Sequence, residues 1–182
     1  MGHTGISNSW KNSWIGGRQP SFDTEIPKKT EGQKPEVSAI NSDINLTDFY
    51  FINGSLDTVA LVDTSNKYIL LETWAETCPP CIKAMNELPS FYRSIQDKVS
   101  VYYVYEHRKA SVRSNFEKIF SFKEIKNKDK ILVDINQELY NALKMQGYPY
   151  FLIFDSDGKL IHYIRGYSDK DRMADQISKY IQ

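Results

Sequence analysis

Cys78 and Cys81 are the only cysteines in the 182-residue sequence, and two residues separate them. They follow an apolar run that begins at Tyr68, and this run predicts a buried strand that ends just before the pair. The residues after Cys81 carry apolar side chains at helical spacing, so the pair should lie at the start of a helix. Unpaired N–H groups and the positive end of the helix dipole stabilise a thiolate there. The pattern therefore predicts thiol-disulfide chemistry.

The order of the two cysteines predicts their roles. A free thiol has a pKa near 8.5, and helix N-termini or Cys-x-x-Cys settings lower it to about 3.5 to 7.5. We expect Cys78 to attack a substrate disulfide and Cys81, one helical turn further on, to resolve the mixed disulfide. Pro79 and Pro80 suit the first helical turn, where a missing N–H group is tolerated. They also remove two donors near the thiolate, so we expect them to tune the redox potential.

The elements that would position this pair alternate between strands and helices. Pro89 is expected to kink the first helix, because it removes one internal hydrogen bond. This alternation implies an α/β sandwich with a largely parallel sheet, and the short connection at 155–158 requires an antiparallel pair at the edge. From residue 67 onward, the pattern predicts strand 67–74, helix 81–99, strand 99–105, helix 111–122, strand 131–133, helix 137–145, strands 150–154 and 160–165, and helix 170–181.

The part of the chain before residue 67 divides into two stretches. Two β-prone runs flank Asn53-Gly54, which predicts a β-hairpin whose two turn residues both have positive φ. Residues 1–40 mix Gly, Ser, Asn, Lys and Pro without a sustained period. We therefore expect a flexible N-terminal arm or linker at 1–40 and one domain at 41–182 that carries the hairpin as an N-terminal extension.

Composition excludes several classes of function. Lys and Arg number 23, as do Asp and Glu, so no excess of positive charge is available to bind nucleic acid. No apolar run approaches the roughly 18 residues of a membrane span, and residues 1–40 lack the apolar core of a signal peptide. We expect a soluble chain without a cofactor. Met1-Gly2-His3 could replace a removed leader, which would allow a membrane tether.

Three features together resemble a known family: Trp74-Ala75 ahead of the Cys-x-x-Cys pair, the Pro79-Pro80 dipeptide, and Gly147-Tyr148-Pro149 ahead of a strand. On these residues the chain, over about 46–182, is similar to the thioredoxin superfamily. It looks most like the TlpA-like thiol-disulfide oxidoreductases of the bacterial envelope, and secondarily like tryparedoxins. The resemblance implies a thioredoxin-like fold, with a central mixed β-sheet flanked by helices.

The resemblance also implies roles for residues outside the pair. Pro149 would be a cis-proline that lies against the nucleophilic cysteine, and the backbone of Tyr148 would pair with an extended substrate segment. Trp74 would contribute to substrate binding. Glu72 matches, by its distance from Cys78, the buried acid that moves protons to and from the resolving cysteine. Burial should raise its pKa and suit it to general acid/base work; the alternative is that Glu72 points to solvent at a strand end.

The function implied is that of a thiol-disulfide oxidoreductase that acts as a reductant of protein disulfides. Its partners would be protein dithiol or disulfide substrates and an upstream electron donor. The expected location is the bacterial cell envelope or periplasm. A cytoplasmic location is the alternative, because cysteines limited to the active site also suit a cytosolic protein.

Two cysteines at this spacing also occur in proteins with other functions. A structural zinc site needs four ligands, and His3, His107 and His162 do not lie at ligand spacing from one another, so no metal is expected. Peroxiredoxins have a Thr three residues before the reactive cysteine, whereas Ala75 precedes Cys78 at that distance. A client-binding or isomerase-type module of the same fold stays open. Two cysteines that serve only as small buried hydrophobes are the last alternative.

Overall fold

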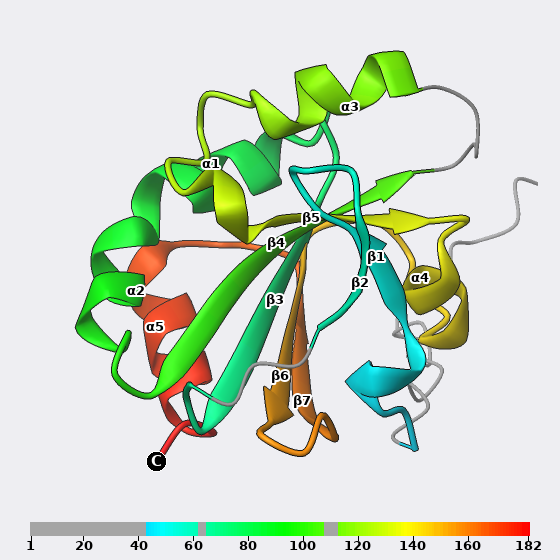
Figure 1. The fold of residues 1–182 in the computed structure, drawn as a ribbon. Helices are drawn as coiled ribbons and strands as arrows, with labels where there is room; N and C mark the ends of the chain where they lie inside the picture. The colour runs from blue at the N-terminus through cyan, green and yellow to red at the C-terminus, as the bar shows by residue number, and fades with distance from the viewer. Residues whose placement is uncertain (1–42, 62–64, 108–112) are drawn as a thin grey trace, which may run out of the picture. The chain divides into compact units, whose positions relative to one another are not determined.

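The computed structural model describes residues 43–61, 65–107 and 113–182. Within these residues, seven strands form one sheet in the order β2-β1-β5-β4-β3-β6-β7, and helices lie on both of its faces (Figure 1). The mixed α/β architecture predicted from the sequence is confirmed. The predicted arm at 1–40 lies outside the described residues.

Strand β3 lies at the centre of the sheet and is buried along its whole length, as its continuous apolar run predicts. It runs parallel to β4, which in turn runs parallel to β5, whereas β6 and β1 join the sheet antiparallel. The short connection between β6 and β7 makes the antiparallel pair expected at that edge. The strands are β1 (Tyr50–Ile52), β2 (Thr58–Ala60), β3 (Tyr68–Trp74), β4 (Val99–His107), β5 (Ile131–Ile135), β6 (Tyr150–Asp155) and β7 (Leu160–Arg165).

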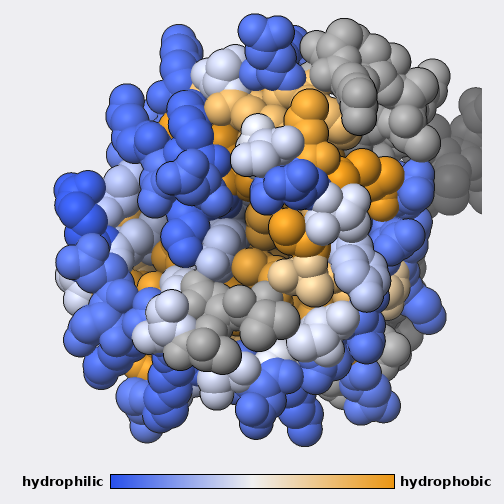
Figure 2. All heavy atoms as spheres, in the orientation of Figure 1, coloured by the Kyte–Doolittle hydropathy of each residue, from blue (hydrophilic) through white to orange (hydrophobic). Residues whose placement is uncertain are grey.

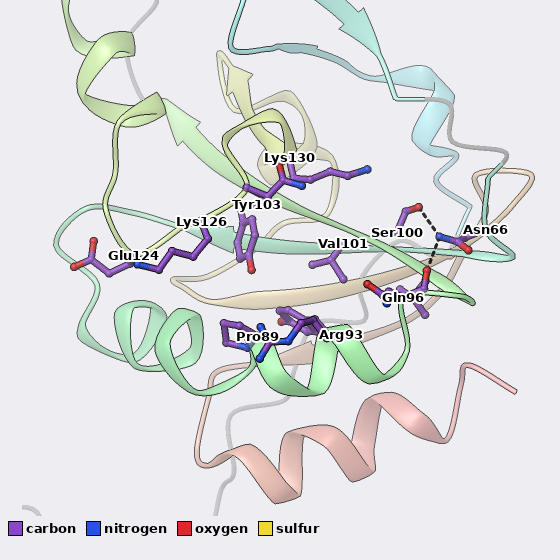
Figure 3. A pocket seen from close by; sticks show the side chains of 13 residues that line it. Asn66, Pro89, Arg93, Gln96, Ser100, Val101, Tyr103, Glu124, Lys126 and Lys130 are labelled. Carbon is purple, nitrogen blue, oxygen red and sulfur yellow. Dashed lines mark hydrogen bonds between the residues drawn. The ribbon is translucent and has the colours of Figure 1, made fainter.

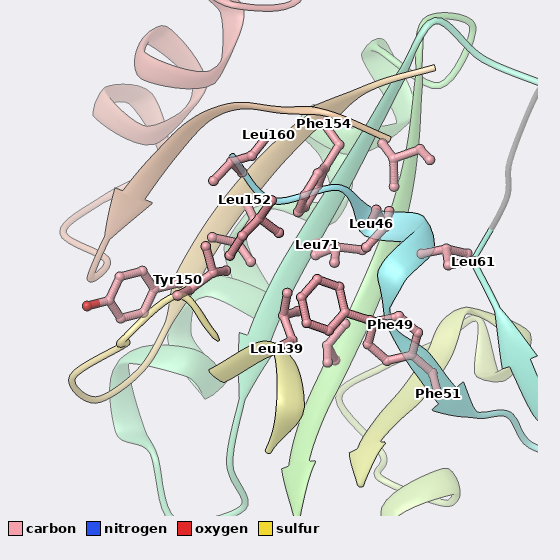
Figure 4. Close-up of a cluster of buried hydrophobic side chains, with 14 of the residues drawn as sticks. Leu46, Phe49, Phe51, Leu61, Leu71, Leu139, Tyr150, Leu152, Phe154 and Leu160 are labelled. Atoms are coloured by element: carbon pink, nitrogen blue, oxygen red, sulfur yellow. The ribbon is translucent and has the colours of Figure 1, made fainter. Parts of the chain in front are cut away.

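The two faces of β3 serve two different cores, because successive side chains of a strand point to opposite faces. Leu70 and Trp74 pack toward the helices α1 (Pro79–Glu87), α2 (Pro89–Ser94), α3 (Arg113–Phe120) and α5 (Lys170–Ser178). Leu71 packs on the other face, beneath α4 (Glu138–Ala142) and the short helix η1 (Leu46–Asp48). Figure 4 shows this second core, in which Leu46 and Leu139 lie near Leu71.

The predicted hairpin is present, but its turn differs from the prediction. Strands β1 and β2 pair antiparallel, and the pairing of Ile52 with Thr58 leaves a loop longer than the two-residue turn expected. The positive φ falls on Leu56, at 66°, and not on the Asn-Gly dipeptide. Asn53 closes the loop instead, because its Oδ1 accepts hydrogen bonds from two backbone N–H groups of the loop, both at 3.0 Å. The prediction of a tight Asn-Gly turn is therefore wrong.

The long kinked helix predicted for 81–99 is divided into two. Helix α1 begins at Pro79, so the two prolines lie in its first turn as expected, just ahead of the predicted range 81–99. Helix α2 begins at Pro89, with Leu88 as the junction. Proline fits the first position of a helix but not its interior, so Pro89 starts a new helix where a kink was expected. The helix predicted for 137–145 is also shorter, since α4 ends at Ala142 and Lys144 already has a positive φ of 49°.

Candidate active site

The two cysteines lie at the junction of β3 and α1 and form a disulfide, with their Cα atoms 5.3 Å apart. Cys78 is the N-cap residue of α1 and keeps 8% of its surface exposed, whereas Cys81 is fully buried. Of the two residues, only Cys78 keeps any exposed surface. The roles of Cys78 as the attacking thiol and of Cys81 as the resolving thiol stay predictions.

The first turn of α1 offers a backbone donor to the exposed sulfur. Pro79 and Pro80 have no N–H group, so the first N–H group of the helix belongs to Cys81. It donates a hydrogen bond to the Sγ atom of Cys78 at 3.2 Å. A donor at a helix N-terminus favours the thiolate form once the disulfide is reduced. The two prolines leave this single donor where an ordinary first turn would offer more.

Aromatic side chains surround the buried side of the disulfide. Trp74 is fully buried and belongs to the same apolar cluster as Cys78 and Cys81. Its ring packs edge-on against Tyr105, with ring centroids 5.0 Å apart, and lies 4.5 Å from the ring centroid of Phe122. The predicted role of Trp74 in substrate binding stays a prediction. With no exposed surface, the ring would act on a substrate through the residues that cover it.

The loop before β6 comes to the disulfide from the far end of the sequence. The peptide bond between Tyr148 and Pro149 is cis, which confirms the isomer that the resemblance implies. Tyr148 packs against the cluster that contains both cysteines. The N–H group of Gly166 donates to the carbonyl oxygen of Pro149 at 2.8 Å, and the N–H group of Tyr150 donates to Oγ1 of Thr73 at 2.8 Å. The loop and the start of β6 are thus fixed to the residue after β7 and to β3.

Glu72 lies on β3 and is fully buried, so the alternative that it points to solvent is wrong. Burial raises its pKa from 4.5 to about 8, and a hydrogen bond from Tyr92 opposes part of this rise. The Tyr92 hydroxyl donates to Oε2 of Glu72 at 2.7 Å. A carboxyl group with a pKa near neutrality suits proton transfer. Its predicted role as proton relay to Cys81 stays a prediction.

Three residues of this site were missed in the sequence. Thr73 and Tyr92 bond to residues whose positions depend on strand register and helix docking, which the chain pattern does not give. Glu76, in the loop before the cysteines, forms an ion pair with Lys118 of α3 at 3.1 Å. In the sequence, the only indication for Glu76 was its position just before the Cys-x-x-Cys motif.

The surface near the disulfide is partly apolar. Phe116 and Phe120 of α3, together with Tyr148, pack partly buried against the cluster that holds the cysteines. Figure 2 shows hydrophobic surface in the region around α3 and the neighbouring strand ends. Such a surface suits contact with an apolar part of a substrate chain.

In the described part of the chain, no three His, Cys, Asp or Glu side chains come together as metal ligands would. None of the helices within 43–61, 65–107 and 113–182 has the length and apolar character that crossing a membrane requires.

Known proteins share this fold. A family model described as a thioredoxin-like domain matches residues 57–181. A thiol:disulfide interchange protein from Chlorobium tepidum, named as putative in its description, is 18% identical, with 79% of this chain and 100% of that chain covered and a TM-score of 0.61. The exposed lipoprotein thioredoxin of Streptococcus pneumoniae is 21% identical, covering 72% and 98% with a TM-score of 0.57. StoA from Bacillus subtilis is 17% identical, covering 71% and 95% with a TM-score of 0.54. No curated protein matches the chain.

Proposed function

The chain belongs to the thioredoxin-like domain family, and from the geometry of its disulfide we propose that it is an oxidoreductase that reduces disulfides in protein substrates. The observation that carries the proposal is the pairing of a partly exposed Cys78 at the N-cap of α1 with a buried Cys81. One sulfur is accessible to a substrate, and the other can be reached only from within the protein.

The reaction starts from the reduced pair. The Cys78 thiolate attacks one sulfur of the substrate disulfide, so a mixed disulfide forms and one substrate thiolate leaves. Cys81 then gives its proton to a base, for which Glu72 is the proposed acceptor, and its thiolate attacks Sγ of Cys78. The second substrate thiolate leaves, and the Cys78–Cys81 disulfide forms. Two electrons pass from the pair to the substrate, and an upstream dithiol must return them.

The first turn of α1 supports a reductant. A pair whose reduced form is strongly stabilised is an oxidant, because the thiolate then resists oxidation. Pro79 and Pro80 provide no N–H groups, and the donor that bonds Cys78 Sγ belongs to Cys81. The thiolate is therefore stabilised less than in a helix with free donors at these positions. This favours electron donation by the protein.

The loop with the cis bond supports a protein substrate. Tyr148 and Pro149 lie in the loop that packs at the disulfide. We assign to the Tyr148 backbone the pairing with an extended substrate segment, as an added strand, and to Pro149 the closing of the site beside Cys78. Trp74 shapes the site from beneath, since it is fully buried.

We place the protein in the bacterial cell envelope, with the cytoplasm as the alternative. The similar protein of Streptococcus pneumoniae is described as an exposed lipoprotein.

Trapping of the substrate tests the function. Cys81→Ser should hold a protein substrate as a stable mixed disulfide on Cys78, because the resolving thiol is missing. Cys78→Ser should trap nothing and should lose essentially all disulfide reduction. If Cys78→Ser keeps full function, the protein is a client-binding module and not an oxidoreductase.

A redox titration of the Cys78–Cys81 pair against glutathione tests the direction. We expect a potential toward the thioredoxin end of the range, about −270 mV. A potential near about −120 mV would make the protein an oxidant and would contradict the assignment as a reductant.

A further inference from the structure

Within the sheet, three of the four neighbours of Glu72 are apolar side chains. Its register partners are Tyr103 on β4 and Phe151 on β6, and paired residues point to the same face. Along β3, the neighbours on that face are Leu70 and Trp74. Phe151, Leu70 and Trp74 are all fully buried. Of these four neighbours, Tyr103 alone carries a hydroxyl group.

Three phenols are close enough to Glu72 to interact with its charge. Tyr92 comes from α2, Tyr103 from β4, and Tyr167 from the segment after β7. The Tyr92 hydroxyl donates to Glu72 at 2.7 Å. The Tyr167 hydroxyl instead donates to Oε2 of Glu87, on α1, at 2.5 Å. Tyr92 is therefore the phenol bonded to the buried carboxyl group.

Tyr92 and Tyr103 both line one cavity of about 330 Å³, which lies between α2, β4 and the segment before β5. Figure 3 shows Val101 and Tyr103 pointing from β4 into the space above Pro89 and Arg93. Apart from Val99, the rest of the lining is polar or charged, which makes the cavity suitable for water. The polar and charged residues are Asn66, Arg93, Gln96, Ser100, Glu124, Lys126, Asn127 and Lys130. Neither cysteine lines this cavity.

We propose, resting on the proposed function, that Glu72 exchanges its proton with solvent through the Tyr92 hydroxyl and this cavity, and not through the surface where Cys78 meets its substrate. In the structure the Tyr92 hydroxyl donates to Oε2; when Oε2 is protonated, this bond is reversed, so that Oε2–H donates to the Tyr92 oxygen and the Tyr92 hydroxyl donates to a water molecule in the cavity. The carboxyl proton then passes to the Tyr92 oxygen while the hydroxyl proton passes to that water. One proton leaves the carboxyl group and one enters the solvent, so charge balances. Tyr92 is thus a positioning and relay residue for the Cys81 step.

The raised pKa values of Glu72 and Tyr92 determine what the relay must do. With a pKa of about 8, Glu72 is mostly protonated at neutral pH and must release its proton before it can accept one from Cys81. Burial and the neighbouring Glu72 raise the pKa of Tyr92 well above its ordinary value, so a free phenolate is disfavoured. The two proton movements at Tyr92 must therefore be concerted.

A pH-jump experiment distinguishes the relay through Tyr92 from a purely structural role of this residue. Reduced protein reacts with dithiobis(nitrobenzoate) in two phases: Cys78 releases the first thionitrobenzoate, and Cys81 releases the second. The reduced protein is either equilibrated well above pH 8 or jumped there from well below it at the moment of mixing, so that Glu72 starts charged in the first protocol and protonated in the second. For Tyr92→Phe, the second phase should be about tenfold slower after the jump than after equilibration. A general base accelerates such a step roughly 100-fold, and the variant should lose a part of that acceleration while Glu72 keeps its proton. The wild type should show no such difference.

Two further variants make the result specific. Val101→Phe leaves the Tyr92 hydroxyl in place but takes up part of the cavity, so it should show a lag of the same kind even if Tyr92→Phe fails to fold. Tyr68→Phe is the matched control, because the Tyr68 hydroxyl bonds to the carbonyl oxygen of Gln182 and not to Glu72. It should behave as the wild type does.

The outcomes distinguish the relay from the function on which it rests. The second phase could show no lag in Tyr92→Phe and Val101→Phe but be slow in Glu72→Gln under both protocols. This result would overturn the proton route through Tyr92 and the cavity, and would leave Glu72 as the base. A normal second phase in Glu72→Gln would overturn the role of Glu72 itself. A lag in Tyr68→Phe as well would show a general effect of lost phenols and would overturn the relay.

Discussion

Glu72 links the chemistry of the site to the stability of the fold. Its pKa is 4.5 in an unfolded chain and about 8 in the folded protein, because burial disfavours the charged form. Between these values the folded chain holds a proton that the unfolded chain has lost, so stability falls as pH rises. The penalty is absent below pH 4.5 and complete above pH 8. The shift corresponds to roughly 5 kcal/mol.

Glu72→Gln should therefore stabilise the oxidised protein at high pH. The amide stays neutral and keeps an oxygen that accepts the Tyr92 hydroxyl. Near pH 4.5 the variant should unfold at no higher urea concentration than the wild type, and above pH 8 it should be more stable by several kcal/mol. Asp134, whose pKa burial raises to about 6, is present in both proteins and cancels in the difference. Equal stability of the two proteins above pH 8 would contradict the buried, raised carboxyl group.

At the scale of elements, the turn between β6 and β7 holds the residues that precede β1. The N–H group of Leu46 donates to the carbonyl oxygen of Gly158 at 2.6 Å, and Nδ2 of Asn45 donates to the carbonyl oxygen of Asp157 at 3.0 Å. Gly158 has a φ of 81°, which side chains other than glycine adopt with strain. The turn thus needs glycine both for its own backbone and for the contact with Asn45.

Gly158→Ala should destabilise the protein more than Gly166→Ala. The two glycines have nearly the same φ, 81° and 80°, so the backbone strain of about 1–2 kcal/mol is common to both. A Cβ atom on Gly158 would lie 2.5 Å from Oδ1 of Asn45, whereas nothing lies within 4 Å of one on Gly166. Urea unfolding should show the larger loss for Gly158→Ala. Equal losses would mean that the Asn45 segment does not pack on the turn.

The sequence predicts correctly those elements that are determined by residues close together in the chain. The continuous apolar run gives β3, the two prolines give the start of α1, and the glycine-containing turn gives the pair β6 and β7. The loop after β1 was mispredicted because the Asn53 side chain, and not the Asn-Gly backbone, closes it. The break at Pro89 was predicted as a kink because sequence shows where a helix is interrupted, but not whether the next turn resumes on the same axis.

The same limit applies to the site. Cys78 and Cys81 are recognisable because two residues separate them. The contact of Tyr92 with Glu72 joins residues 20 positions apart, and that of Tyr150 with Thr73 joins residues 77 positions apart. Both contacts depend on how helices and strands dock across the sheet. Sequence could name Glu72 as a buried acid, but not the phenol that bonds it.

At the scale of the whole molecule, the central position of β3 gathers the site on one face of the sheet. Glu72 and Trp74 belong to β3, the cysteines follow it directly, and β4 and β6 place Tyr103 and Phe151 on either side of Glu72. The other face holds a separate core that includes Ile44, Leu46 and Phe49, all ahead of β1. The chain from residue 43 onward therefore contributes to the folded domain before the first strand begins.

This arrangement predicts where the chain can be shortened. A protein that begins at residue 41 should unfold at the same urea concentration as the full chain, because the predicted arm ends at residue 40. One that begins at residue 49 should be less stable by about 2–5 kcal/mol or more, since it lacks Leu46, fully buried, and Ile44, with 6% of its surface exposed. Urea unfolding of both, with the disulfide intact, measures the difference. A loss of stability in the protein that begins at 41 would show that residues 1–40 are part of the folded unit, and would move the domain boundary toward the N-terminus.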